Sequence, residues 1–107
     1  MKGSEQQTKK ATDDMAITSA FLLASQSALK PLLRPSAHRE VGRFIGRIES
    51  DVEAKKFLTW AARVVRAHRR DARGGRPKIA ARIVRSAPEG LFRRPERAYR
   101  PRYIFTQ

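Results

Sequence analysis

The chain has 107 residues, which allows one small domain with a core of modest size, and its 24 Lys and Arg against 10 Asp and Glu give a formal net charge of +14. It has no cysteine, which excludes disulfides, thiolate metal sites and thiol catalysis. The longest apolar run, residues 20–24, is too short for a membrane span or a signal peptide, so we expect a soluble, cytoplasmic protein.

The first predicted helix follows a flexible leader, residues 1–11, which shows no apolar periodicity. Thr12 or Asp13 can cap this helix, and Pro31 is expected to end it. Its expected buried face consists of apolar residues at helical spacing: Ile17, Phe21, Ala24 and Ala28.

A second predicted helix begins after the turn at Pro35 and is amphipathic. Its apolar residues follow the i, i+3, i+4, i+7 pattern: Val41, Phe44, Ile45, Ile48 and Val52. Ser50 and Glu53 form a capping box, in which the Ser side chain accepts a hydrogen bond from the Glu53 amide and the Glu side chain reaches back. The capping box predicts a break near Ser50, where a third helix starts.

The third predicted helix ends at Gly74-Gly75, a pair able to adopt the left-handed conformation of a helix stop. Its apolar residues form a stripe: Phe57, Leu58, Ala61, Val64, Val65 and His68. Trp60 lies off the best-defined line of this stripe. We therefore expect its side chain to be partly exposed, close to the arginines of the same helix.

A short fourth helix is expected between Pro77, which suits a first helical turn, and Pro88. Its apolar residues Ile79, Ile83 and Val84 share one face. Residues 103–106 have the composition of a strand, but no partner strand is visible in the sequence. The prediction is an all-α fold, a small three- to four-helix bundle over residues 12–87, with the flexible N-terminal leader before it and an extended, basic C-terminal tail over residues 88–107.

Apolar and basic residues are unevenly distributed. Of the 23 Leu, Ile, Val and Phe residues, 19 lie between residues 15 and 84, where the core is therefore expected. Residues 1–55 have a net charge of +2, whereas residues 56–107 have a net charge of +12, and 13 of their 15 basic residues are Arg. Guanidinium groups pair with phosphate in a bidentate manner and stack on bases, although GC-rich coding also raises the arginine content.

The third helix presents a row of arginines at the spacing i, i+3, i+7, i+10: Arg63, Arg66, Arg70 and Arg73. Side chains at this spacing lie along one side of a helix, beside the apolar stripe, and can contact several phosphates of a nucleic-acid backbone at once. The alternative is a solvated helix face. Such a face normally mixes both signs of charge, whereas only Asp71 interrupts this row, so we favour phosphate binding.

The linker before the fourth helix, Gly75-Arg76-Pro77-Lys78, resembles the core of an AT-hook, in which arginine beside a Gly-Arg-Pro turn enters the minor groove of DNA. The resemblance covers these four residues and implies DNA contacts by Arg76 and Lys78. A complete hook has arginine where Gly74 stands. An ordinary linker between two helices is the alternative.

The C-terminal tail combines basic and aromatic side chains that suit single-stranded nucleic acid, because bases stack on aromatic rings while arginine contacts the backbone. The predicted contact residues of the tail are Arg93, Arg94, Arg97, Tyr99, Arg100 and Arg102. The competing interpretation is a peptide that docks on a protein partner, since proline-rich extended segments are pre-organised for recognition.

No catalytic residue, metal site or cofactor is predicted. Asp51, Glu53 and Lys55 resemble the acidic pattern of some metal-dependent nucleases, but their position in a first helical turn indicates capping. His38 and His68 are thirty residues apart, without a cluster of carboxylates to complete a metal site or a triad. We expect His68 at the edge of the core and His38 on the surface.

The sequence therefore predicts a small basic protein that binds DNA or RNA through the arginine row and the tail, and that is not an enzyme. The alternative is an adaptor or accessory subunit of a larger nucleoprotein, ribonucleoprotein or mobile-element assembly, docked through its tail. Attachment to anionic lipid is a third, weaker possibility, because it normally also needs a bulky apolar face.

Overall fold

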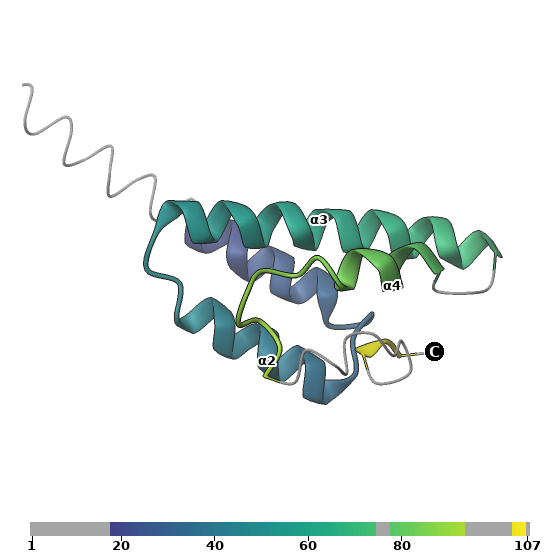
Figure 1. The fold of residues 1–107 in the computed structure, drawn as a ribbon, viewed down its shortest axis with the longest axis horizontal. Coiled ribbons are helices and arrows are strands. Elements are labelled where there is room, and N and C mark those ends of the chain that lie inside the picture. The colour runs from purple at the N-terminus through teal and green to yellow at the C-terminus, as the bar shows by residue number, and fades with distance from the viewer. Residues whose placement is uncertain (1–17, 75–77, 94–103, 107) are drawn as a thin grey trace, which may run out of the picture.

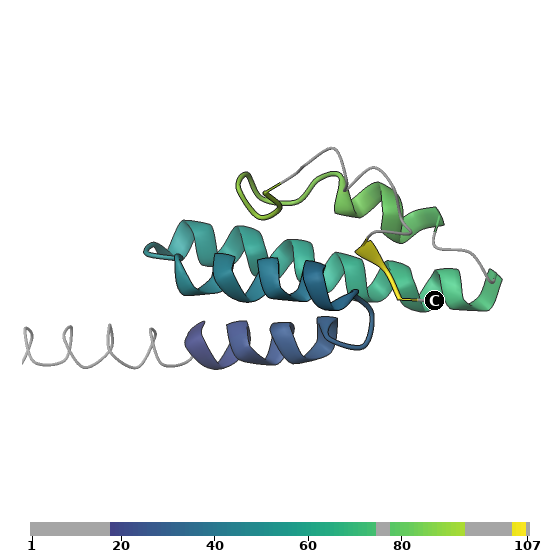
Figure 2. The ribbon, with the colours of Figure 1, turned by 90° about the horizontal axis from the view of Figure 1, so that it is seen from below.

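The computed structural model describes residues 18–74, 78–93 and 104–106 of the chain, and these are mostly helical. Residues 18–29, here called the N-terminal helix, are followed by α2 (Pro35–Gly46), α3 (Asp51–Gly74) and α4 (Lys78–Val84). Figures 1 and 2 show α2 and α3 side by side, with the N-terminal helix on one face of this pair and α4 on the opposite face. The predicted all-α helical bundle is confirmed.

The starts of α2 and α3 follow the local sequence signals. Pro35 occupies the first turn of α2, where its missing amide hydrogen costs nothing. Before α3, the Oγ of Ser50 accepts a hydrogen bond from the Glu53 amide at 3.2 Å, while a carboxylate oxygen of Glu53 accepts one from the Glu49 amide at 3.3 Å. The capping interpretation is confirmed, although the amide that donates to the Glu53 carboxylate is that of Glu49 and not that of Ser50.

Trp60 is part of the core, so the prediction of partial exposure is wrong. Its side chain is 3% exposed, its ring centroid lies 5.9 Å from that of Phe57 and 6.2 Å from that of Phe92, and its Nε1–H donates to the Ile83 carbonyl at 3.0 Å. The physical reason is that α3 is covered on two sides. The predicted stripe faces the middle of the bundle, while Trp60 lies against α4.

Tryptophan fluorescence tests this position. We expect the emission of Trp60 to be blue-shifted, poorly quenched by acrylamide and unchanged by saturating oligonucleotide, because the ring is shielded and its N–H already has an acceptor. The variant Trp60→Phe, which has no N–H, is expected to lower the melting temperature. Red-shifted emission that is readily quenched would contradict the buried position.

The core extends beyond the segment in which the sequence placed it. Four side chains after residue 84 are nearly inaccessible: Leu91, Phe92, Ile104 and Phe105. Phe105 forms an isolated antiparallel bridge with Leu33, flanked by hydrogen bonds from the Arg34 amide to the Ile104 carbonyl at 2.8 Å and from the Thr106 amide to the Leu32 carbonyl at 3.0 Å. The turn before α2 is therefore the partner of residues 104–106, while Tyr103 lies outside the described residues. Confinement of the core to residues 15–84 is wrong.

The N-terminal helix turns a different face to the core from the one predicted. Leu22 and Leu29 are buried, whereas Phe21 is 58% exposed, and Ala24 and Ala28 are exposed as well. Ile17 lies outside the described residues. Leu22 and Leu29 are seven residues apart, so they share one side of this helix, and Phe21, Ala24 and Ala28 share another. Burial of the two leucines removes more apolar surface from water than burial of the two alanines would. Among the described helices, none is long and apolar enough to cross a membrane.

Candidate functional site

The outer surface of α3 is strongly basic. From residue 55 to its C-terminus the helix has a single acidic residue, Asp71, which is 7% exposed. Every basic side chain of this stretch is exposed: Lys55, Lys56, Arg63, Arg66, Arg69, Arg70 and Arg73. The exposed charge along these five turns of helix is therefore of one sign only.

Three members of the predicted arginine row line one pocket. Arg63, Arg66 and Arg70 border a shallow pocket of about 190 Å³ between α3 and α4, together with Ala67 of α3 and the two isoleucines of α4, Ile79 and Ile83. Within the described residues, none of the three arginines has an ion pair or a hydrogen bond. The fourth member, Arg73, is exposed near the end of α3 and does not line this pocket.

The carboxylate of Asp71 is hydrogen-bonded to the start of α4, and in the described part of the chain it forms no ion pair with the arginine row. Its two oxygens accept hydrogen bonds from the Ile79 amide, both at 3.0 Å, and one of them also accepts from the Ala80 amide at 2.9 Å. The carboxylate thus acts as an N-cap supplied from another helix, and its negative charge lies at the positive end of the α4 dipole. The one acidic residue among the arginines has a structural role.

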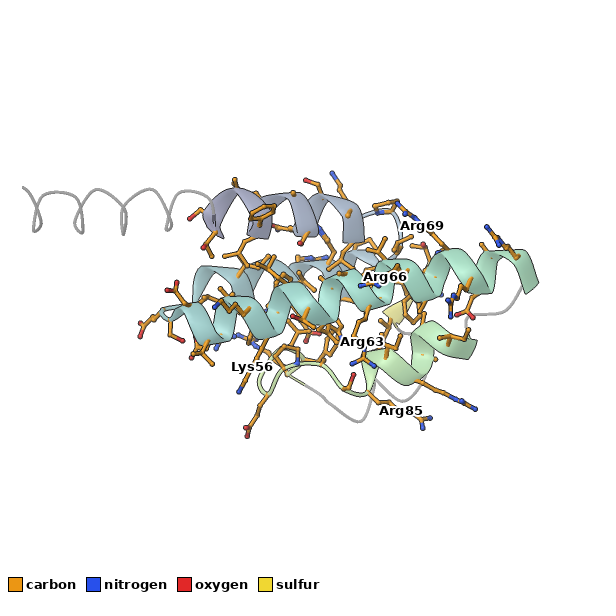
Figure 3. The ribbon with its side chains drawn as sticks, turned by 90° about the horizontal axis from the view of Figure 1, so that it is seen from above. Lys56, Arg63, Arg66, Arg69 and Arg85 are labelled. Carbon is orange, nitrogen blue, oxygen red and sulfur yellow. The ribbon has the colours of Figure 1, made fainter. Side chains whose placement is uncertain are left out.

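The basic surface is wider than the predicted row. In Figure 3, Arg63 lies on the edge of α3 next to α4, and Lys56 and Arg85 lie on the same side of the molecule. Arg66 points outward from α3, and Arg69 lies on the opposite edge, next to the N-terminal helix. Lys56 precedes Arg63 by two helical turns, so helical spacing alone would have found it. Arg85 is brought here only by the packing of α4 on α3.

Among the remaining predicted contact residues, the structure describes the side chain of Arg93 alone. Arg93 is exposed, and its backbone amide donates to a carboxylate oxygen of Glu40 on α2 at 3.3 Å. Lys78 begins α4, and its side chain is not described. The other predicted contacts, with the four-residue AT-hook likeness and most of the tail, lie outside the described residues: Arg76, Arg94, Arg97, Tyr99, Arg100 and Arg102.

A second pocket, of about 400 Å³, carries both signs of charge. Its charged lining residues are Arg47, Glu53, Lys56 and Glu89, so it offers a polyanion carboxylates as well as cations. For this reason it suits a polyanion less well than the pocket at the arginine row.

The two histidines are held by structural contacts. The ring of His68 is half-buried, 6.1 Å from that of Phe105, which places it at the edge of the core as predicted. His38 is half-buried and hydrogen-bonded through Nε2 to the Gln26 carbonyl at 3.0 Å, so its expected surface position is wrong.

No protein-family model, curated protein or solved structure matches this chain. The chemistry of the surfaces described above is therefore the basis for a proposed function.

Proposed function

We propose that the protein binds nucleic acid in the cytoplasm, as a binding protein rather than an enzyme, and that the basic side chains along α3 contact the phosphate backbone. One observation carries this proposal. Arg63, Arg66 and Arg70 are exposed on α3, and the carboxylate of Asp71, the one acidic residue of this helix after residue 55, is buried and accepts hydrogen bonds from amides of α4. Several unpaired guanidinium groups in a row are the arrangement that a regularly spaced polyanion can use.

The dimensions of the row fit a nucleic-acid backbone. The ten residue steps from Arg63 to Arg73 span about 15 Å at the helical rise of about 1.5 Å per residue. That length equals about four base-pair steps of duplex DNA at 3.4 Å each, so neighbouring arginines along the row can meet successive phosphates. Each neutralised phosphate releases condensed counterions, which makes such binding strongly dependent on salt.

Binding to an anionic membrane surface is less well supported. It needs cations and large apolar side chains on the same face, so that the latter insert between lipids. In the described part of the chain, the three large apolar residues that are more exposed than Ile79 lie away from the arginine row. Phe21 and Leu23 belong to the N-terminal helix, on the face of the α2–α3 pair opposite to α4, and Val52 is in the first turn of α3, about three helical turns before Arg63. Among the described residues, Ile79, 41% exposed, is the one exposed large apolar residue that lines the pocket at the arginine row.

The proposal is tested by the salt dependence of binding to duplex DNA. If about five phosphates are contacted, log affinity should fall with log salt at a slope of roughly −4 to −5. The variant Arg63→Gln, Arg66→Gln, Arg70→Gln keeps helix propensity and removes three contacts, so its slope should be flatter by roughly two to three units. Fluorescence anisotropy between low and physiological salt measures both slopes.

Two further triple variants have the same change in net charge. Lys30→Gln, Arg39→Gln, Arg47→Gln removes exposed cations from other elements, and we expect its slope to stay within about one unit of the wild type. Arg94→Gln, Arg97→Gln, Arg100→Gln removes cations from the C-terminal segment and is expected to weaken single-strand binding more than duplex binding. If all three variants behave alike, only bulk charge acts. If the wild type binds no nucleic acid at low salt, the proposed function is wrong.

A further inference from the structure

The pocket at the arginine row combines basic and apolar side chains. Ile79 is 41% exposed and Ile83 is half-buried, and both line the pocket from α4, opposite Arg63, Arg66 and Arg70 of α3. The stems of arginine side chains are themselves apolar, while their guanidinium groups reach solvent. The pocket therefore offers an apolar surface to one part of a ligand and cations to the neighbouring part.

The two walls of this pocket are fixed to each other at both ends. At the start of α4, the Asp71 carboxylate holds the Ile79 and Ala80 amides, and one turn later the Trp60 N–H holds the Ile83 carbonyl. Ala80, fully buried, adds an apolar contact between these two attachments. The backbone of both isoleucines that line the pocket is therefore held by hydrogen bonds. Because the pocket is already formed before a ligand binds, less binding free energy is spent on ordering it.

The pocket is large enough for only a small part of a ligand. A volume of about 190 Å³ is room for roughly six water molecules and is below the usual range for whole small-molecule ligands. It suits one ring-sized group. Nucleic acid is a polymer in which each unit joins a phosphate to a flat ring with apolar faces. In a duplex these faces are covered by stacking, so only an unpaired base can present them.

We propose, building on the function proposed above, that this pocket receives one unpaired base against Ile79 and Ile83 while the three arginines hold the flanking phosphates. The protein then prefers single strands or unpaired segments over regular duplex. The aliphatic contact with one base is expected to be weaker than stacking on an aromatic side chain, and we expect it to contribute about five-fold in affinity, or ~1 kcal/mol.

The experiment compares three fluorescein-labelled probes at one low salt concentration: a twelve-residue oligothymidylate, an abasic strand with the same sugar-phosphate backbone, and a twelve-base-pair duplex. We expect the wild type to bind oligothymidylate about five-fold more tightly than the abasic strand. Ile79→Ser removes the exposed aliphatic side chain and should abolish this preference without changing abasic or duplex binding. Val52→Ser, which alters an aliphatic residue 63% exposed in the first turn of α3, is the control and should keep the preference.

The outcomes separate this inference from the proposed function. Equal affinity of the wild type for oligothymidylate and the abasic strand, with binding that still weakens as salt rises, overturns the base pocket and leaves backbone binding in place. The same holds if Ile79→Ser, shown to be folded by circular dichroism, weakens all three probes equally or none of them. Failure of every probe to bind the wild type overturns both.

Discussion

Replacing Asp71 with Ala is expected to destabilise the protein by about 2–4 kcal/mol, because three hydrogen bonds to a buried carboxylate and the cap of α4 are lost together. For a domain of this size the melting temperature should fall by roughly 10–25 °C. Thermal unfolding followed by circular dichroism measures this change. The amides of Ile79 and Ala80, which lose their acceptor, account for most of the cost.

The matched control is Glu89→Ala, which removes one carboxylate from an exposed position of the loop after α4. Both variants raise the net charge by one, so bulk electrostatics predicts tighter nucleic-acid binding by both. We expect tighter binding by Glu89→Ala alone. Asp71→Ala should bind oligothymidylate less tightly than the wild type at temperatures where it is folded, because α4 is no longer fixed beside the arginine row. Similar stability of the two variants would contradict the capping role of Asp71.

Helix starts were predictable from the sequence because they depend on neighbouring residues. Pro35 occupies the first turn of α2, and the capping pair Ser50 and Glu53 marks the start of α3 through a hydrogen bond within one turn. The helix ends follow the sequence signals less closely, because Gly74 ends α3 without a positive φ and α4 ends at Val84, four residues before Pro88. The grouping of Arg63, Arg66 and Arg70 was predictable as well, since it follows from helical spacing alone.

Contacts between elements were not predictable in this way. Helical spacing identifies an apolar side of α3, but it does not show that α4 covers the adjacent side, where Trp60 and Asp71 lie. Asp71 appeared as an interruption of the basic row because its bonding partners are eight and nine residues away, across the segment between α3 and α4. The common face of Ile79 and Ile83 follows from their spacing in the sequence, but its position opposite the arginine row depends on the same packing.

The C-terminal residues illustrate the limit of proline as a sequence signal. Prolines exclude long helices and central strands, and the sequence was therefore interpreted as an extended tail after residue 87. A proline does not prevent the side chains between prolines from packing. Leu91 and Phe105 are buried in the core although neither belongs to α2, α3 or α4, and Phe105 is paired through one β-bridge. A segment can therefore contribute side chains to the core whether or not it forms a helix or a strand.

Phe105→Ala is therefore expected to cost about 3–5 kcal/mol, the usual range for truncating a buried phenylalanine. The side chain is 3% exposed, contacts the ring of His68 and belongs to the segment paired with Leu33, so its removal leaves a cavity at the junction of α3 with the turn before α2. Small domains have a total stability of about 5–15 kcal/mol, so the variant should show a much lower melting temperature or no cooperative transition.

Phe21→Ala is the matched control, since it deletes the same atoms from a side chain that is 58% exposed. We expect it to cost less than about 1 kcal/mol, because most of the ring is already in contact with water. Thermal and urea unfolding of the two variants give the difference directly. If Phe105→Ala melts at the temperature of Phe21→Ala, residues 104–106 contribute no packing energy and the bridge to Leu33 only positions the end of the chain. If Phe21→Ala lost more stability than Phe105→Ala, Phe105 would not be a core residue, and Phe21, Ala24 and Ala28 would form the buried face of the N-terminal helix.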